Sequence, residues 1–376
     1  MQTPGLLWTL MFFALAISPL IFIHELGHYA VGRWFGVKAE VFAIGFGRQI
    51  AHWTDRRGTR WQIGWLPLGG YVRFAGDMGA TSEPSEAWLK LPLAERNQTF
   101  QSKPVWQRAL IVLAGPATNF LFAIIVFIGV FANYGEPRTA PVVATVVAGS
   151  AAAAAGIRSG DRIDAVAGRR VSRFEDVARI VAIRPDERLR VELTRGGQAI
   201  VVFAVPRSDV LRDRFGNETR RGLLGIGAGK RTNVRLAPHE LLGASVRFTA
   251  DSVRMMADTL MQVVTGRRSL AELGGPVKIA QVSGQQATLG PLDFLLFMTM
   301  ISINLGFINL LPIPTLDGGH LAFYGLEALR RRPVGLQVQE WAYRTGLLVL
   351  LTFMVAVTVN DLAGLGLWNR LAGLIG

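Results

Sequence analysis

Cysteine is absent from this chain, and charge is absent from long stretches of it. None of the 376 residues is cysteine, which excludes a disulfide framework and any zinc site built on thiolates. The first 23 residues contain no Lys or Arg, so they lack the basic region that begins a secretory signal peptide. We therefore expect the N-terminal apolar segment to be a retained membrane span. Any bound metal must use His, Asp or Glu.

The composition is typical of a protein that lies partly in lipid and partly in water. Half of the residues (50%) are hydrophobic, 18% are charged, and the mean hydropathy is +0.32. A formal net charge of +13 can indicate nucleic acid binding, but a basic membrane protein that faces anionic headgroups explains it equally well. Because no nucleic-acid motif is present, we expect a lipid bilayer and no nucleic acid among the partners.

A His-Glu-x-x-His motif lies in the first apolar segment. His24 and His28 are four residues apart, so on a helix both imidazoles lie on one face and can bind one ion, which we expect to be zinc. Glu25 follows the first histidine, where a carboxylate can accept a proton from water. Two histidines can also serve only as hydrogen-bonding groups inside a helix bundle. However, an ionisable side chain at mid-bilayer costs ~2.5–3.5 kcal/mol, so three together favour a function.

Runs without charge predict four membrane spans. The first span covers residues 1–35 and is free of charge from Leu6 to Ile23; the others cover about Ala109–Ala132, a stretch that begins near Pro291, and about Thr345–Asn360. Basic residues are frequent between the first and second spans, and the positive-inside rule places that side in the cytoplasm. We therefore expect an inner-membrane protein with its central soluble region on the periplasmic side and the metal motif nearer the cytoplasmic face.

The segment between the first two spans favours β-structure. Branched and aromatic residues interrupted by glycines predict strands at Gln49–Trp53 and Arg60–Leu66, joined by a turn at Asp55–Gly58. The hairpin is apolar for a cytosolic loop, and it can enter the membrane where it is buried in protein or lines a wet cavity. A structural sheet and a substrate-binding edge are equally open interpretations.

The second span contains the motif Gly115-Pro116-x-x-Asn119. Small residues allow close approach of helices, and Asn119 is expected to form a hydrogen bond between helices in lipid. This motif alone does not specify a function.

The central region is largely water-soluble. Strands predicted at Val142–Val147, Leu189–Thr194 and Ala199–Val205, with a helix at Phe174–Ile183, follow an order that resembles a bacterial PDZ domain ending near Gly229. PDZ domains bind an extended peptide or a chain terminus by strand addition. A purely architectural role is the alternative.

A helical region follows the central region. Residues Pro238–Thr265 carry an apolar stripe opposite charged residues, which predicts an amphipathic helix on the outer membrane surface or under the central region. Ser269 and Glu272 have the spacing of a capping box for a further short helix.

Depth in the membrane selects a third metal ligand. His24 lies ~15 Å before the end of the first span. Asp317 falls near the inner end of the third span, which runs in the same direction, after Pro312 and Pro314 have bent the chain. Five other candidates lie at the outer ends of spans, after the glycine pair or outside the spans: Asp293, Asp361, His320, His52 and His239. A set of three ligands leaves a fourth zinc position open for water, as catalysis requires.

Together these motifs resemble the site-2 protease family of intramembrane zinc metalloproteases, of the bacterial regulator-of-sigma-E protease type. The resemblance extends over nearly the whole chain and rests on these elements: His24-Glu25-x-x-His28, Gly45-Phe46-Gly47, Pro67-Leu-Gly-Gly-Tyr71, Gly115-Pro116-x-x-Asn119, the PDZ-like region and Asn309-x-x-Pro312-x-Pro314-x-x-Asp317-Gly. It implies zinc held by His24, His28 and Asp317, with Glu25 as general base. It also implies substrate contacts from Asn304, Asn309 and the membrane-associated β element at Val41–Arg73, in which Gly45, Phe46 and Gly47 are the candidate residues. The chain has room for one PDZ domain rather than two, so substrate gating inferred from tandem domains does not carry over.

We therefore expect a polytopic α-helical membrane protein with about four transmembrane helices, a membrane-associated β-hairpin and an inserted α+β PDZ domain. The expected regions are, in order, the first span (1–35), the β region (36–106), the second span (107–133), the PDZ domain (138–229), the amphipathic helical region (237–289), the third span with its aspartate (290–326) and the fourth span (341–368).

The resemblance implies cleavage within the membrane span of a single-span protein. Such a substrate has already been shortened on its outer side and is an anti-sigma factor in stress-response signalling or a remnant signal peptide. A membrane scaffold or chaperone with a PDZ domain and a structural metal site is the alternative, and it would tolerate Glu25→Gln. A transporter would need further polar residues at mid-membrane, and the spans offer few.

Overall fold

The computed structural model describes residues 5–76, 91–212, 218–230, 232–265 and 274–364. The chain divides into two compact units: unit 1 contains Met1–Phe127, Val246–Ala257 and Leu270–Gly376, and unit 2 contains Ile128–Ser245 and Asp258–Ser269. The expected metal motif lies in unit 1, and the expected PDZ region (138–229) lies in unit 2.

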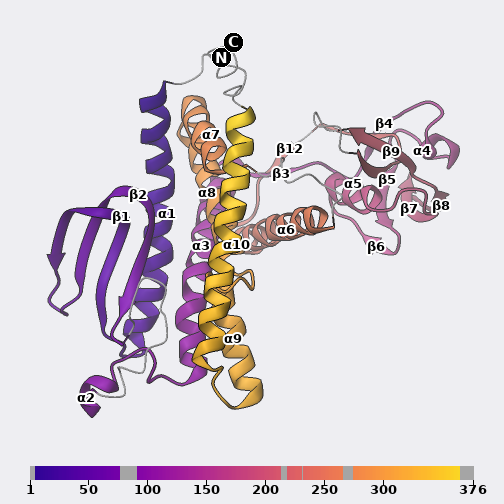
Figure 1. Ribbon diagram of the computed structural model, residues 1–376. Coiled ribbons are helices and arrows are strands. Elements are labelled where there is room, and N and C mark those ends of the chain that lie inside the picture. Colours follow the sequence, from indigo (N-terminus) through magenta and orange to yellow (C-terminus); the bar gives the residue numbers. More distant parts are fainter. Residues whose placement is uncertain (1–4, 77–90, 213–217, 231, 266–273, 365–376) are drawn as a thin grey trace, which may run out of the picture. The chain divides into compact units, whose positions relative to one another are not determined.

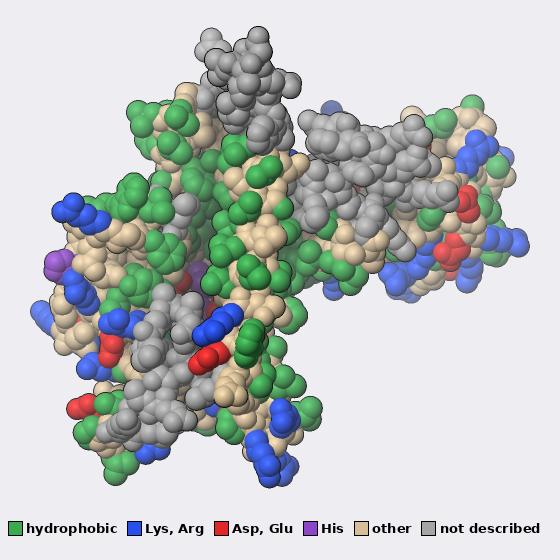
Figure 2. Space-filling model, in the orientation of Figure 1, with side chains coloured by type: hydrophobic (Ala, Val, Ile, Leu, Met, Phe, Trp, Pro, Cys, Tyr) green, Lys and Arg blue, Asp and Glu red, His purple; other side chains and the backbone are tan. Residues whose placement is uncertain are grey.

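Unit 1 is built on long apolar helices (Figure 1). Among the described residues, four helices are long and apolar enough to cross a membrane: α1 (Leu6–Trp34), α3 (Val105–Tyr134), α8 (Pro291–Asn309) and α10 (Leu336–Gly364). The most apolar stretch of each has a mean hydropathy between 1.7 and 2.4. Hydrophobic side chains cover the outward surface of α10 (Figure 2), where Leu348 and Val355 are 66% and 62% exposed. Such a surface fits contact with lipid rather than water.

The region predicted as the third span contains two helices rather than one. α8 ends at Asn309, and α9 (Asp317–Arg330) begins after an irregular connection that holds Pro312 and Pro314. The predicted bend is therefore confirmed, because neither proline is accommodated within a helix. Asp317 is the first residue of α9.

Two shorter helices, α2 (Leu93–Arg96) and α7 (Pro276–Leu289), also belong to unit 1, whereas the residues of the 27-residue helix α6 (Pro238–Val264) are divided between the two units. The helix predicted over 238–265 is confirmed as α6, whereas the capping box predicted from Ser269 and Glu272 lies outside the described residues. Trp8 of α1 donates a hydrogen bond from Nε1 to the Gly284 carbonyl of α7 (3.3 Å). The α7 helix is thereby held against α1.

Strands β1 (Ala39–Thr54) and β2 (Arg60–Phe74) form more than the simple hairpin that the sequence predicted. Val41 pairs with both Arg60 and Arg73, and Ile44 pairs with both Ile63 and Gly70. The first half of β1 therefore lies between the two halves of β2. The predicted strands at 49–53 and 60–66 are only the outer part of this sheet, and the stretch from Gly70 to Phe74 forms its other side.

Glycines allow the two strands to bend back on themselves. Gly45, Gly47 and Gly69 have φ of +79°, +85° and +84°, a region that side chains disfavour. The bend in β1 thus falls at the Gly45-Phe46-Gly47 element. These residues have a conformational role in the sheet whatever else they contact.

The turn between β1 and β2 is tied to α1. The Asp55 carboxylate accepts hydrogen bonds from the backbone N–H of Arg57 (2.8 Å) and Thr59 (2.9 Å), from Trp61 Nε1 (3.0 Å) and from the Tyr29 hydroxyl of α1 (3.4 Å). Desolvation alone would raise the pKa of Asp55, but these hydrogen bonds outweigh it and hold that pKa below its usual value. The sheet is thereby fixed beside the helix that carries the metal motif.

Unit 2 contains the remaining strands and two short helices. In chain order they are β3 (Glu136–Arg138), β4 (Val143–Val146), α4 (Ala151–Ala154), β5 (Arg162–Val166), β6 (Arg169–Arg170), α5 (Phe174–Ala182), β7 (Leu189–Arg195), β8 (Gln198–Ala204), β9 (Arg207–Arg212), β10 (Glu218–Leu223), β11 (Ile226–Ala228) and β12 (Thr232–Val234). The strands predicted in this region match β4, β7 and β8, and the predicted helix matches α5.

The core of unit 2 lies between its sheet and α5. The antiparallel sheet has the order β6-β5-β7-β8, while β4 pairs with β11. Ile163, Val177, Leu189, Val191 and Leu193 belong to one buried cluster. Asp161 is buried at the edge of this cluster and accepts hydrogen bonds from Arg195 Nε (2.7 Å) and Nη2 (2.8 Å). The unit therefore has a hydrophobic core of its own.

Candidate metal centre

Helix α1 presents two imidazoles to one point. His24 and His28 lie one helical turn apart, and their Nε2 atoms are separated by 3.2 Å. His24 is 7% exposed and its ring meets that of His28 edge-on, with centroids 4.9 Å apart. The i, i+4 spacing thus places two imidazole nitrogens side by side in an apolar helix, as predicted.

Asp317 reaches the same point from α9. Its Oδ2 lies 3.2 Å from His24 Nε2 and 3.5 Å from His28 Nε2. The two residues that follow it have no room for a side chain: a Cβ on Gly318 would overlap the Leu311 carbonyl, and one on Gly319 would overlap that of Ile313. The start of α9 is thereby packed tightly against the connection from α8, and this packing sets the position of Asp317.

The three groups converge in a manner that suits a cation. One ligand atom from each of His24, His28 and Asp317 lies within 4.8 Å of the others, and within the described part of the chain this is the single cluster of that kind. Asp317 Oδ2 is buried and makes no hydrogen bond among the described residues. A buried carboxylate oxygen beside two imidazole nitrogens is unfavourable without a shared positive charge. Two nitrogens and a carboxylate are also a donor set that zinc accepts.

Helix α3 contacts both imidazoles. His28 Nδ1 lies 2.9 Å from the Ile111 carbonyl, which can only accept, so Nδ1 of His28 carries a hydrogen, and in the neutral ring this arrangement leaves a lone pair on Nε2. A Cβ on Gly115 would overlap the His28 ring and would lie 2.9 Å from Cε1 of His24. Asn119 Nδ2 lies 3.1 Å from His24 Nδ1. The predicted hydrogen bond of Asn119 between helices is thereby confirmed, but nothing in the sequence identified His24 as its partner.

Glu25 lies in the wall of a large cavity. The cavity has a volume of about 630 Å³, and its lining includes His24, Glu25, His28 and Asp317 together with Gly69–Val72 of β2. The Glu25 side chain packs against Gly70, where an added Cβ would lie 3.2 Å from Glu25 Cγ. The Val72 amide of β2 faces the Glu25 carboxylate. A proton-accepting group, the three convergent groups and the edge of the sheet thus share one space.

Of the five residues expected to contact substrate, one lines the cavity and four do not. Asn309, at the end of α8, lines the cavity, whereas Asn304 and Gly45, Phe46 and Gly47 are not among its lining residues. Gly45 and Gly47 belong to the bend of β1, and the Phe46 side chain is 45% exposed. Gly69, Gly70 and Tyr71 of β2 do line the cavity, and the sequence reasoning did not single them out as site residues.

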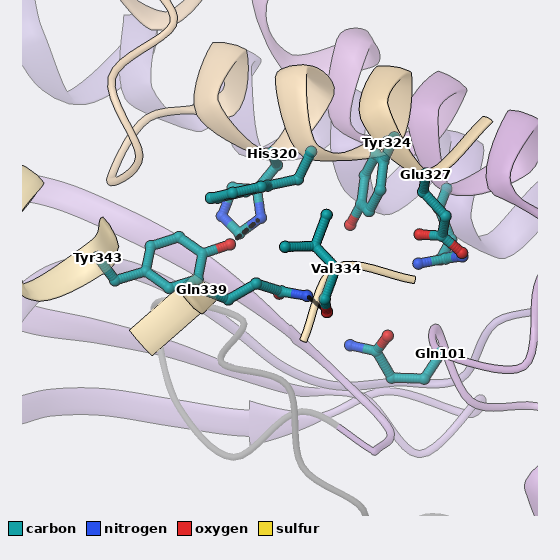
Figure 3. Close-up of a pocket in the computed structure, with 9 residues that line it drawn as sticks. Gln101, His320, Tyr324, Glu327, Val334, Gln339 and Tyr343 are labelled. Atoms are coloured by element: carbon teal, nitrogen blue, oxygen red, sulfur yellow. Dashed lines mark hydrogen bonds and ion pairs between the residues drawn. The ribbon is translucent and has the colours of Figure 1, made fainter. Parts of the chain in front are cut away.

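His320 lies close to the cluster but is engaged elsewhere. Its Nδ1 is 2.9 Å from the Tyr343 hydroxyl, and the two rings lie near each other in a small polar pocket that also contains Glu327 and Gln339 (Figure 3). His320 lines the large cavity as well, yet it is not part of the three-residue cluster. This placement agrees with the expectation that Asp317, rather than His320, joins the histidine pair.

The other four residues rejected as a third metal ligand are also not part of the cluster. Asp361 accepts hydrogen bonds from the backbone N–H of Gly275 (3.2 Å) and Lys278 (3.0 Å), so it caps the start of α7. Asp293 lies in the first turn of α8. His52 is exposed in β1, and His239 lies in α6.

Comparison with known proteins shows to which protein family the chain is similar. The profile of peptidase family M50 matches residues 12–353. The chain is 43% identical over 358 residues to a protein of Agrobacterium fabrum named as a candidate zinc metalloprotease, covering 94% of this chain and 95% of that protein. It is 42% identical over 364 residues to one of Mesorhizobium japonicum with a similar name, covering 95% and 99%. With metalloprotease MmpA of Caulobacter vibrioides it shares 35% identity over 396 aligned positions, covering 98% and 99%.

Proposed function

Because this chain belongs to peptidase family M50, and is therefore a zinc-dependent metalloprotease, we propose that it hydrolyses a peptide bond within the membrane span of a single-span protein. One observation carries the proposal. His24, His28 and Asp317 converge beside Glu25 at the wall of a cavity of about 630 Å³, in a unit whose long helices are apolar enough to cross a membrane. The scaffold alternative has no observation in its favour.

The zinc ligands in this proposal are Nε2 of His24, Nε2 of His28 and a carboxylate oxygen of Asp317. The fit rests on the convergence of their ligand atoms and on the buried, unsatisfied Asp317 Oδ2. Zinc bound there supplies Lewis acidity, which polarises a peptide carbonyl and makes water a better nucleophile at neutral pH. The apolar surroundings strengthen this electrostatic effect.

Glu25 is proposed as the general base. Its carboxylate lies on the cavity wall next to the ligand positions without being one of the three clustered groups, so it is free to accept a proton. It then holds that proton and donates it to the amide nitrogen of the leaving chain, since amine departure needs protonation. Gly70 and Val72 of β2 limit where the carboxylate can go.

Substrate binding is proposed to use the edge of β2 that lines the cavity. A transmembrane helix hides its carbonyl groups in hydrogen bonds, so cleavage requires a locally extended segment. The stretch from Gly70 to Phe74 pairs with β1 through one edge and contributes residues to the cavity. An extended segment can add to such an edge by main-chain hydrogen bonds. Asn309 can bond to the exposed backbone, while Asn304 and Gly45-Phe46-Gly47 act in the supporting structure or at an earlier stage of substrate entry.

Residues 138–229 are proposed to be a PDZ domain that binds a peptide or a protein terminus. Support comes from the independent hydrophobic core of unit 2 and from its order of strands around α5. Positive-inside bias supports a periplasmic position for this domain and an inner-membrane location for the protein. The proposed substrates are then anti-sigma factors or remnant signal peptides, admitted after a first cut on the outer side.

Co-expression tests the proposed reaction. Wild type and Glu25→Gln are each expressed with epitope-tagged single-span proteins whose outer domains have been removed, and the cleaved fragment is detected and sequenced. We expect a cut inside the apolar span with wild type and no cut with Glu25→Gln, while the purified variant keeps its zinc because the ligands are unchanged. Cleavage outside the span, or cleavage by Glu25→Gln at the wild-type rate, would refute the proposal.

A further inference from the structure

Asn119 occupies an unusual position behind the metal centre. It is completely buried in α3, and its Nδ2 lies 3.1 Å from His24 Nδ1. Its backbone carbonyl accepts a hydrogen bond from the Ser302 hydroxyl of α8 (3.0 Å). A polar side chain held this firmly in an apolar bundle has a specific partner, and here the partner is a proposed zinc ligand.

The hydrogen positions on His24 decide whether it can bind a cation. An amide nitrogen can only donate, so Nδ2 facing Nδ1 would place the hydrogen of a neutral imidazole on Nε2. Yet His24 Nε2 lies 3.2 Å from Asp317 Oδ2 and 3.2 Å from His28 Nε2, where a free lone pair is needed for metal binding. Asn119 Oδ1 is meanwhile buried without a hydrogen-bond partner among the described residues.

One rotation of the Asn119 amide gives its oxygen a hydrogen-bond donor and leaves Nε2 of His24 free to bind a cation. The two ends of a carboxamide have nearly the same shape, so exchanging Oδ1 and Nδ2 requires no movement of the helices. The oxygen then accepts a hydrogen bond from Nδ1–H of His24. Nε2 of His24 is left with a lone pair directed at Asp317 and His28.

We propose that Asn119 is a positioning residue that accepts a hydrogen bond from His24 Nδ1–H through Oδ1 and thereby fixes the tautomer of His24 that binds zinc. The proposal rests on the proposed function, because it takes His24 as a ligand. His28 has an equivalent partner on the same helix, since its Nδ1 faces the Ile111 carbonyl at 2.9 Å. Helix α3 thus provides none of the three clustered groups and orients both histidines.

The test compares two substitutions that differ in hydrogen bonding. Asn119→Asp keeps an accepting oxygen at the same place, and Asn119→Leu has a similar size without any acceptor. The zinc dissociation constant of the full-length protein in detergent is measured by competition with a chelator, and the melting temperature of the metal-free protein reports folding. Loss of an outer partner of a ligating histidine typically weakens metal binding by about 10- to 100-fold. We expect that loss for Asn119→Leu and an affinity within a few-fold of wild type for Asn119→Asp.

Two controls separate this proposal from the one on which it rests. Ser302→Ala removes the hydrogen bond to the Asn119 backbone but keeps the side chain, so it should bind zinc like wild type. His24→Ala removes the ligand itself. If His24→Ala keeps zinc with wild-type affinity, the ligand assignment is wrong. If His24→Ala loses zinc but folded Asn119→Leu does not, or if Asn119→Asp loses as much affinity as Asn119→Leu, the role of Asn119 is refuted.

Discussion

Replacement of Gly115 by alanine should damage the metal centre more than the fold. Gly115 lies on the face of α3 that meets the two imidazoles, and an added Cβ would lie 2.9 Å from His24 Cε1 and still closer to the His28 ring. Carbon atoms in ordinary contact are ~3.5–4.0 Å apart. The rings must therefore move by about 0.6–1.1 Å, and by more at His28. Displacement of about 1 Å in a catalytic site can cost roughly 100-fold in rate.

The same substitution has a favourable effect on the helix itself. Alanine is preferred over glycine within a helix by about 1 kcal/mol, which offsets part of an overpacking cost of about 1–3 kcal/mol. We therefore expect Gly115→Ala to fold, with a melting temperature close to that of wild type, but to lose most of its activity and to bind zinc more weakly.

A second glycine on the same helix provides the control. Gly129 also lies in α3, and an added Cβ there would have no atom within 4 Å. Gly129→Ala should keep full activity and zinc affinity. The assays are chelator competition for zinc, cleavage of a single-span substrate and thermal unfolding in detergent. Wild-type zinc affinity and activity in Gly115→Ala would refute the packing argument, and equal damage in both variants would point to a general effect on the helix.

Two further predictions concern the aspartates Asp317 and Asp161. Asp317→Ala should lose zinc and activity, whereas His320→Ala should keep zinc, because His320 bonds to Tyr343 and lies outside the three-residue cluster; the opposite pattern in metal analysis would overturn the ligand assignment. In unit 2, the hydrogen bonds of Arg195 lower the pKa of buried Asp161 below its usual value, so the stabilisation they give is complete above a pH of about 4 and is lost as pH falls through the lowered pKa. Hydrogen-exchange protection of β5 and β7, corrected for intrinsic rates, should fall below pH 4 in wild type and should be low at every pH in Asp161→Asn. Protection in wild type that does not change below pH 4 would contradict the prediction.

Local patterns made much of the architecture predictable. The apolar runs indicated helices because a helix satisfies its own backbone in lipid and because the runs are too long for the strands of a barrel. The four-residue spacing placed His24 and His28 together, and the depth argument chose Asp317 from six candidates. The structure brings these three residues to one point, while their role as zinc ligands remains a proposal.

Long-range pairing was not predictable in the same way. Alternating residues indicate a strand but do not identify its partner, so the pairing of Val41 with both Arg60 and Arg73 could not be predicted. Likewise, the contact between Asn119 and His24 joins residues 95 positions apart. The motif around Gly115 indicated close helix packing. The structure shows that the groups packed against Gly115 are the imidazole rings of α1.

Adjacent residues of the His-Glu-x-x-His motif are supported by different parts of the fold. Successive residues of a helix point about 100° apart, so His24 and His28 face α3 while Glu25 faces β2. The histidines contact Gly115, Ile111 and Asn119, whereas Glu25 packs against Gly70 of the sheet. The proposed metal binding and the proposed base catalysis should therefore be separable by mutation, although they depend on adjacent residues of one helical turn. Changes in α3 should act through zinc, and changes at the edge of β2 should slow turnover while zinc stays bound.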